Sequence, residues 1–136
     1  MTTALALRVA RIAEGVYAVA AMVLAFSLPL PPRGPGVVLF AHWLGTALLA
    51  AAICLRLGRP NRQTWYVAAL LAFYILFNAV VAVSRMLGPQ ADVLARPTLL
   101  ALGVGALLWV TQIVVAVCLY HARELRTMPS AVERRR

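Results

Sequence analysis

A carboxyl group stands inside an apolar stretch that is long enough to cross a membrane. Glu14 lies within the run from Val9 to Leu28, with Arg11 three residues before it and Tyr17 three residues after it. On a helix, that spacing places all three on one face. Gln112 falls at a similar depth in the last apolar run. An acid in a spanning helix costs roughly 2.5–3.5 kcal/mol on insertion scales, so it normally faces protein or water and indicates a functional site.

Two interpretations of Glu14 follow from its neighbours. As a protonatable group, it can exchange a proton for a substrate or donate one to a bound apolar molecule. Burial and a nearby guanidinium act on its ionisation in opposite directions, so its neighbours decide this chemistry. Alternatively, Arg11 and Glu14 form an ion pair that neutralises both residues near the membrane surface. The ion pair predicts that Glu14 stays ionised.

A second polar group is expected nearer the opposite membrane face. Tyr74, Asn78 and Arg85 recur at helical spacing and form one stripe, and His42 lies at a similar depth in the preceding apolar run. If the stripe faces the other helices, these residues line a pocket that opens outward, with His42 as a second acid–base candidate. The alternative is plain hydrogen bonding between helices, worth about 0.6 kcal/mol per contact.

Cys54, Cys118 and His121 are the remaining candidates for chemistry. Cys118 and His121 share a helix face, and thiolates with an imidazole can bind a metal. Their spacing matches no closed metal site, however, and a buried cysteine usually acts as a small apolar side chain. We therefore expect no metal site, and the sequence identifies no cofactor. It contains no glycine-rich phosphate loop, H-E-x-x-H or G-x-S-x-G motif.

The elements that position these residues are predicted to be membrane helices. Of the 136 residues, 63% are hydrophobic and 12% are charged, and the mean hydropathy is +0.87. A soluble domain of this length needs a more polar surface. The apolar residues form four runs of about twenty, each long enough to cross a bilayer. We predict one all-α integral membrane domain over residues 1–128, with helices at about 5–28, 37–57, 64–86 and 98–124, and a disordered basic tail over 129–136.

Caps and helix breakers define the predicted helix ends. Thr2 or Thr3 suits the N-cap of the first helix, and Asn61 or Thr64 that of the third. Gly58 suits the end of the second helix. Because the connections are short, neighbouring helices are expected to be antiparallel, in an up-down-up-down four-helix bundle.

The arginines predict the orientation in the membrane. The chain has a net charge of +9 and no lysine, and its thirteen arginines lie mostly at the ends of the apolar runs. Ten would share the side of the termini and three the other side, which places both termini in the cytoplasm. The ten are Arg8, Arg11, Arg56, Arg59, Arg62, Arg123, Arg126 and Arg134–Arg136, and the three are Arg33, Arg85 and Arg96.

The composition also predicts the partners and the cellular location of the protein. Because topology accounts for the positive charge, no nucleic-acid partner is expected, and the lipid bilayer is the expected environment. The use of arginine without lysine is typical of a GC-rich bacterial genome. We therefore expect a multi-pass protein of a bacterial inner (cytoplasmic) membrane.

Several segments resemble the DoxX-like group of small bacterial membrane proteins. They are Leu7-Arg8-Val9-Ala10-Arg11, Trp43-Leu44-Gly45, the Arg59-Pro60 turn and Ser84-Arg85-Met86-Leu87-Gly88. The resemblance implies four membrane helices and a link to small-molecule or redox chemistry. His42 stands where that group often has a charged residue. Glu14 also resembles the membrane acid of small multidrug resistance transporters, which act as dimers, although the third apolar run lacks their glycine-rich pattern.

Three functions are compatible with these observations. The first is binding or transforming a small lipophilic molecule in an intramembrane pocket, with Glu14 or His42 as the acid–base group. The second is an accessory subunit of a larger membrane complex, and the third is a proton-coupled small-molecule transporter acting as a homo-oligomer. In the first, the residues expected to contact the ligand are Arg11, Tyr17, Tyr74, Asn78, Arg85 and Gln112.

Overall fold

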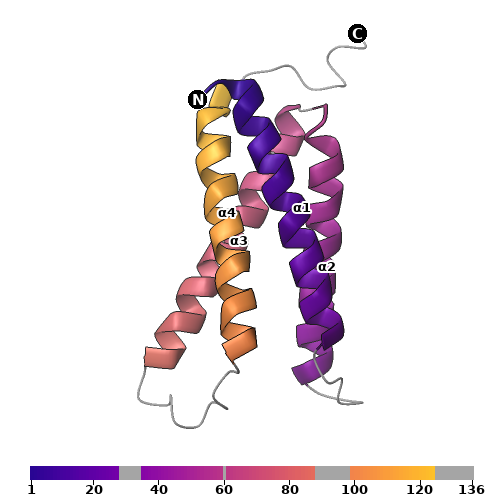
Figure 1. The fold of residues 1–136 in the computed structure, drawn as a ribbon, viewed down its shortest axis with the longest axis vertical. Coiled ribbons are helices and arrows are strands. Elements are labelled where there is room, and N and C mark those ends of the chain that lie inside the picture. Colours follow the sequence, from indigo (N-terminus) through magenta and orange to yellow (C-terminus); the bar gives the residue numbers. More distant parts are fainter. Residues whose placement is uncertain (28–34, 60, 88–98, 125–136) are drawn as a thin grey trace.

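The described residues of the computed structural model form four α-helices (Figure 1). The structure describes residues 1–27, 35–59, 61–87 and 99–124, apart from the side chains at 35, 36, 38, 39, 82, 85–87 and 99–102. The helices are α1 (Thr3–Ser27), α2 (Pro35–Arg56), α3 (Arg62–Leu87) and α4 (Leu99–His121). The predicted all-α class and the number of helices are confirmed. The predicted tail over 129–136 lies outside the described residues.

Two of the expected N-caps are present. The Leu5 amide donates to the Thr2 hydroxyl over 3.4 Å at the start of α1. At the start of α3, the Asn61 Oδ1 accepts from the Thr64 amide at 2.8 Å and from the Thr64 hydroxyl at 3.0 Å. Each cap satisfies an amide that has no partner within its own helix. The helix bounds agree with the predicted ones to within three residues: α1, α2 and α3 each begin two residues earlier, and α4 ends at His121, three residues before 124.

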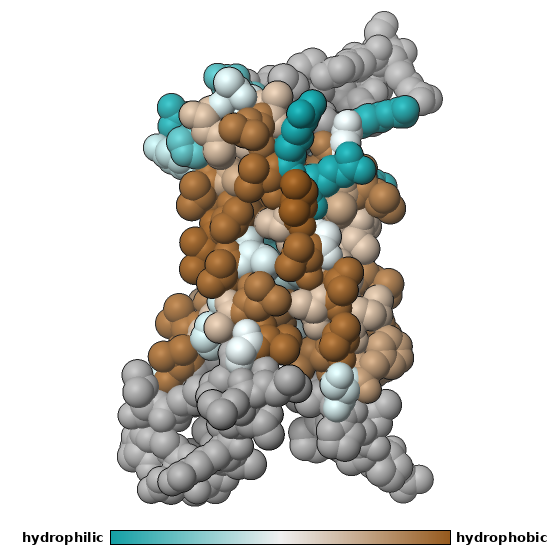
Figure 2. Space-filling view, viewed as in Figure 1, coloured by the Kyte–Doolittle hydropathy of each residue, from teal (hydrophilic) through white to brown (hydrophobic). Residues whose placement is uncertain are grey.

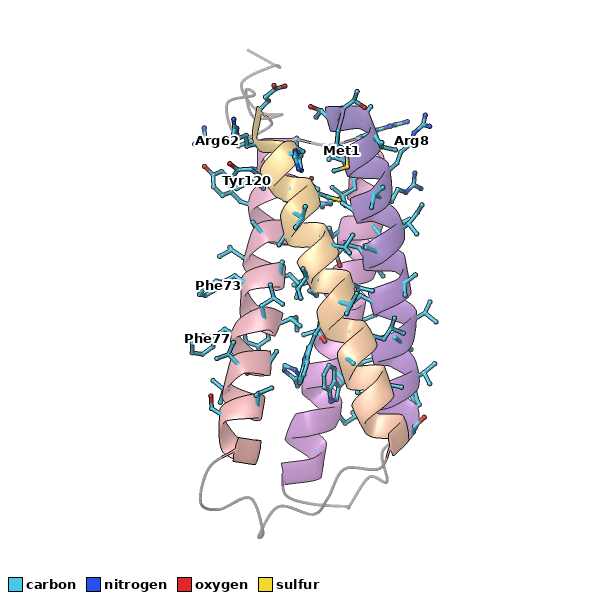
Figure 3. The ribbon with its side chains drawn as sticks, turned by 60° about the vertical axis from the view of Figure 1, so that its left-hand side comes forward. Met1, Arg8, Arg62, Phe73, Phe77 and Tyr120 are labelled. Carbon is cyan, nitrogen blue, oxygen red and sulfur yellow. The ribbon has the colours of Figure 1, made fainter. Side chains whose placement is uncertain are left out.

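The outer surface suits a membrane. Three helices are long and apolar enough to cross one, over Thr3–Ser27, Arg62–Val81 and Gly103–His121, and Phe40–Arg56 of α2 is a shorter apolar helix. Hydrophobic residues cover the middle of the molecule, and hydrophilic residues gather at the end where α1 begins (Figure 2). On α3, Phe73 and Phe77 point outward from the bundle (Figure 3). These features are those of a membrane protein.

The helices contact one another in the ring order α1, α2, α3, α4. In the described part of the chain, α1 packs extensively against α2 and α4, whereas α2 and α3 share the least extensive contact. Arg11, near the start of α1, lies beside Gly58 at the end of α2. The Trp65 indole, near the start of α3, donates to the Leu119 carbonyl near the end of α4 at 3.0 Å. In these two pairs, the start of one helix lies beside the end of the other.

Small residues bring α1 close to its neighbours. Its buried face carries five alanines and two polar residues, namely Ala6, Ala10, Ala13, Glu14, Tyr17, Ala21 and Ala25. Small side chains let membrane helices approach closely, because little stands between the backbones. At Gly15, an added Cβ would lie 3.6 Å from the Cys54 sulfur on α2. This close packing removes Glu14 and Tyr17 from the surface.

Candidate functional site

Glu14, Tyr17 and Gln112 form a group of polar side chains that we call the buried cluster. Each of the three has an exposed fraction of 0%. Glu14 and Tyr17 lie on the packed face of α1, and Gln112 reaches Glu14 from α4. The Gln112 Nε2 donates to the Glu14 Oε2 over 3.3 Å. The similar depth expected for Glu14 and Gln112 is therefore realised as a direct contact.

The buried cluster holds more hydrogen-bonding capacity than its helices use. The Glu14 Oε1, the Tyr17 hydroxyl and the Gln112 Oε1 are buried and have no hydrogen-bond partner among the described residues. A buried polar atom without a partner costs about 1–3 kcal/mol, and nearly all such atoms in native proteins are bonded. Three of them on adjoining side chains therefore indicate a place where a further polar group binds.

The types of these atoms define the group that would fit them. The amide oxygen of Gln112 and an ionised carboxylate oxygen can only accept hydrogen bonds, whereas a phenol hydroxyl can donate or accept. The cluster therefore suits a partner that donates, such as a hydroxyl or an amine. The Thr46 hydroxyl lies closest to the Tyr17 hydroxyl, in looser contact than a full hydrogen bond, and Tyr74 lies near enough to act on it electrostatically.

Sequence reasoning did not single out Thr46 as a neighbour of Tyr17. Its hydroxyl donates to the Trp43 carbonyl of its own helix at 3.1 Å. A threonine in an apolar helix is a weak signal, because its hydroxyl is commonly bonded to its own backbone in this way.

The predicted ion pair between Arg11 and Glu14 is wrong. Arg11 is exposed, and its Nη1 lies 3.5 Å from the position that a Cβ would take on Gly58. The long side chain extends to the polar end of the bundle, as arginines near the ends of membrane helices do. Among the described residues, Gln112 is the hydrogen-bond partner of Glu14, and no cation pairs with the carboxyl group.

His42 and Tyr74 form a second polar contact, which joins α2 to α3. The Tyr74 hydroxyl lies 3.0 Å from the His42 Nδ1, and the two rings are 5.6 Å apart. Asn78 does not join them: it is exposed, and its Nδ2 donates to the Tyr74 carbonyl at 2.7 Å. The side chain of Arg85 lies outside the described residues. The structure thus brings together two of the four residues expected in this group.

Tyr17 is the member of the buried cluster nearest to the His42–Tyr74 contact, whereas Glu14 lies nearer the other end of α2. Gly15, next to Glu14, lies against Cys54 of α2, and His42 precedes Cys54 by twelve residues in the same helix. At 1.5 Å per residue, that separation is about 18 Å along the helix. Glu14 therefore lies closer to the level of Cys54 than to that of His42, and Tyr17, on which Tyr74 acts electrostatically, lies between the two polar groups.

The cysteines do not form the metal site that was considered as an alternative. Cys54 is half-buried on α2, Cys118 is buried on α4, and His121 is exposed. Within the described ranges, no group of three histidine, cysteine or acidic residues could hold a metal ion. Cys54 and Cys118 serve instead as small packing residues.

Comparison with known proteins adds no relative. No family model, curated protein or solved structure matches this chain. The resemblance to DoxX-like proteins therefore stays a prediction, and the function has to be argued from the site itself.

Proposed function

We propose that this protein crosses a bacterial cytoplasmic membrane four times, as an up-down-up-down bundle with both termini in the cytoplasm. Arginine placement supports this orientation, with ten arginines on the side of the termini and three on the other. The contacts from Arg11 to Gly58 and from Trp65 to Leu119 support antiparallel neighbours. The 22 residues of α2 give a length of about 33 Å, which is enough to cross a hydrocarbon core.

Within this bundle, we propose that the buried cluster binds a small lipophilic molecule that carries a hydroxyl or an amine. The observation that carries the proposal is the set of three buried oxygens without partners on Glu14, Tyr17 and Gln112. A donor on the ligand would satisfy them in surroundings where water cannot compete. Leu108 and Val115, both with 0% exposure, flank Gln112 on α4 and suit the apolar body of such a molecule.

Access to the buried cluster requires the helices to separate. Glu14, Tyr17 and Gln112 have 0% exposure, and they line none of three grooves that described residues form elsewhere on the bundle. The least extensive helix contact is that of α2 with α3, which the hydrogen bond from Tyr74 to His42 crosses. We propose that this seam opens to admit the ligand. In this proposal, His42 and Tyr74 control access, and Glu14 makes the polar contact with the ligand.

A proton-coupled carrier is the second candidate. The observation that favours it is that Glu14 has no cationic partner in the described part of the chain. A proton or a substrate cation can then balance the carboxylate in turn, which is how exchange is coupled in many membrane transporters. Four helices enclose little space, so this function would require a homo-oligomer.

The test begins with native mass spectrometry of the full chain, gently extracted from its own membrane. We expect a bound small molecule of fixed mass, whose dissociation constant is then measured for the wild type and for Glu14→Gln and Gln112→Leu. Losing one hydrogen bond to a charged group costs about 1.5–3 kcal/mol, or roughly ten- to hundredfold in Kd. Thr111→Val is the matched control, because that hydroxyl already bonds the Leu108 carbonyl at 2.8 Å.

The other outcomes separate the alternatives. A larger co-extracted protein at fixed stoichiometry, with Glu14→Gln silent, would make this chain an accessory subunit. A homo-oligomer whose pH-dependent uptake is lost in Glu14→Gln would make it a carrier. A protein without bound molecule or partner, in which Glu14→Gln behaves like Thr111→Val, would reduce the buried cluster to a packing feature and overturn the proposal.

A further inference from the structure

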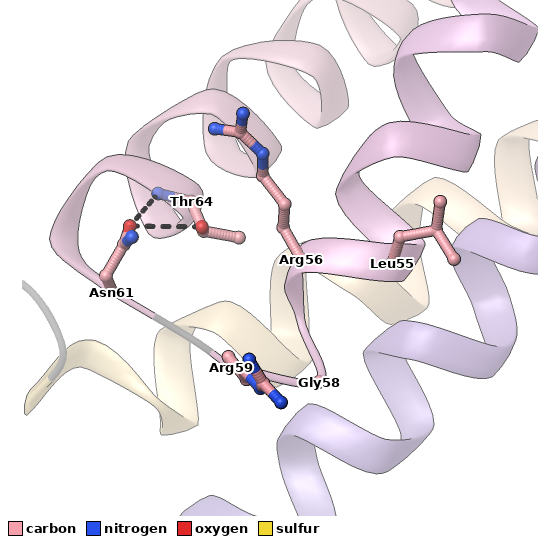
Figure 4. A pocket seen from close by; sticks show the side chains of 6 residues that line it. All are labelled: Leu55, Arg56, Gly58, Arg59, Asn61 and Thr64. Carbon is pink, nitrogen blue, oxygen red and sulfur yellow. Dashed lines mark hydrogen bonds between the residues drawn. The ribbon is translucent and has the colours of Figure 1, made fainter.

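A cleft lies where the end of α2 turns into the start of α3 (Figure 4). Its volume is about 460 Å³, and its lining consists of Leu55, Arg56, Gly58, Arg59, Asn61 and Thr64. A second groove of about 270 Å³ is lined by Leu49, Ala52, Ile53, Arg56, Gln63, Thr64 and Val67. Arg56 and Thr64 line both spaces. The two therefore adjoin, with a polar cleft at one end and a mostly apolar groove at the other.

Three guanidinium groups lie at the polar cleft. Arg56 and Arg59 line it directly. Arg11 approaches from α1, with its Nη1 3.5 Å from the position that a Cβ would take on Gly58, which is also in the lining. Among the described residues, no acidic side chain lines either space. Arg56 and Arg59 extend from opposite sides of the cleft (Figure 4), so an anion bound in it would be met by both side chains turning inward.

Neutral donors add to this positive charge. Because the Thr64 backbone amide can only donate, the atom of Asn61 that bonds it at 2.8 Å must be the Oδ1. The cap therefore uses the oxygen of the Asn61 side chain and leaves its Nδ2 available as a donor. The start of α3 also contributes the partial positive charge of a helix N-terminus. Guanidinium groups with amide donors are the groups that proteins use to bind phosphate.

The position of the two spaces matches the layers of a membrane. α2 ends at Arg56 and α3 begins at Arg62, so the polar cleft lies where both helices leave the apolar part of the bundle. On the face that Figure 2 shows, strongly hydrophilic residues gather at this same end. From there, the groove past Ala52, Ile53 and Val67 follows α2 and α3 toward the apolar middle. A ligand filling both spaces would need an anionic head and an apolar tail.

We propose that this cleft and groove bind one anionic glycerophospholipid, from the leaflet in which α1 begins. Its phosphate lies in the polar cleft, where the Arg56 and Arg59 side chains turn in to meet it, with Arg11 beside Gly58 and the Asn61 Nδ2 as a neutral donor. One acyl chain lies along the apolar groove. The site is separate from the buried cluster, so the lipid is a second ligand. This assigns Arg11 to the lipid site, which explains why its guanidinium extends away from Glu14.

The experiment compares spin-labelled lipids around the full chain in phosphatidylcholine vesicles. Labelled phosphatidylglycerol and labelled phosphatidylcholine with the same chains are added separately, and the motionally restricted fraction is measured by electron paramagnetic resonance. We expect the wild type to prefer the anionic lipid and Arg56→Gln/Arg59→Gln to lose that preference, by roughly fivefold for each arginine removed. The control, Arg8→Gln/Arg62→Gln, removes the same charge from two exposed arginines at the same end (Figure 3).

The control isolates the site from general attraction to the surface. Arg62 lies over the Tyr66 ring, 5.8 Å from its centroid, and neither Arg8 nor Arg62 lines the cleft or the groove. We expect this variant to keep the lipid preference. Equal loss in both double variants would mean that the lipids respond only to net charge, and would overturn the proposal.

A second pair of variants tests the groove without changing the charge. Ala52→Phe fills the groove, whereas Leu48→Phe adds bulk on an exposed position of the same helix outside it. We expect only Ala52→Phe to weaken the preference for labelled phosphatidylglycerol. If Ala52→Phe has no effect, or if millimolar inorganic phosphate displaces the labelled lipid, the ligand is a free anion and the lipid proposal is wrong.

Discussion

Among the residues of the buried cluster, Tyr17 has a polar atom that can be removed with little change in shape. Its hydroxyl is buried without a partner in the described part of the chain. Removing such a group relieves its desolvation penalty. We expect Tyr17→Phe to leave the free energy of unfolding unchanged or to raise it by up to about 1 kcal/mol. The same variant should bind the ligand more weakly. Thermal unfolding in detergent, with and without the co-extracted molecule, measures both effects.

Thr64→Val is the comparison for that measurement. The Thr64 hydroxyl donates to the Asn61 Oδ1 at 3.0 Å. Removing the hydroxyl therefore takes away one of the two hydrogen bonds that this oxygen accepts. We expect Thr64→Val to lower the free energy of unfolding by about 1 kcal/mol. Equal destabilisation by Tyr17→Phe would show that the Tyr17 hydroxyl has a partner in the membrane.

At this scale, the sequence predicted the neighbours of Glu14 only in part. Depth along the apolar runs correctly related Glu14 to Gln112, because rise per residue is nearly constant in helices. The pairing with Arg11 failed, because a spacing of three residues does not decide which way a long side chain extends. Gly58, beside which Arg11 lies, is distant in sequence, so no local pattern could have revealed that contact.

At the scale of helices, the contact between α2 and α3 is the one expected to open. The hydrogen bond between Tyr74 and His42 spans it, and such bonds in membranes contribute about 0.6 kcal/mol on average. We expect Tyr74→Phe to increase amide hydrogen exchange in α2 and α3 by about threefold, and to speed ligand release. Asn78→Ala is the control, because its side chain bonds the backbone of its own helix. The same increase in both variants would exclude a gating role for the bond.

The helices themselves were predictable, but their buried faces were not. Long apolar runs and the caps at Thr2 and Asn61 gave the helices to within a few residues. A lipid-facing side chain is as apolar as a core side chain, so hydropathy does not separate the two faces. On α1, size separates them instead: alanines face the other helices, whereas Ile12, Val19 and Phe26 are 66–68% exposed. Small residues mark the packed side of a membrane helix.

At the scale of the whole molecule, the orientation in the membrane is a prediction from the arginines that can be tested directly. In a chain with Cys54 and Cys118 replaced by alanine, we expect a cysteine at Ser130 to react with an impermeant thiol reagent only after the cells are opened. A cysteine at Gln90, on the opposite side in this topology, should react in intact cells. Labelling at Ser130 from outside would invert the orientation and place the arginine-rich end outside the cell.

The alanine face of α1 also determines which mutations reveal anything about this protein. Alanine scanning looks for lost side-chain volume, but at Ala6, Ala10, Ala13, Ala21 and Ala25 there is almost none to lose. The sensitive direction is the opposite one, because added methyl groups push the backbones apart, and overpacking typically costs about 1–3 kcal/mol. A single-step change such as alanine to valine would loosen the helix that holds Glu14. Harmful inherited variants of this protein should therefore be those that replace a buried alanine of α1 with a larger residue. Alanine scanning would not detect the importance of these positions.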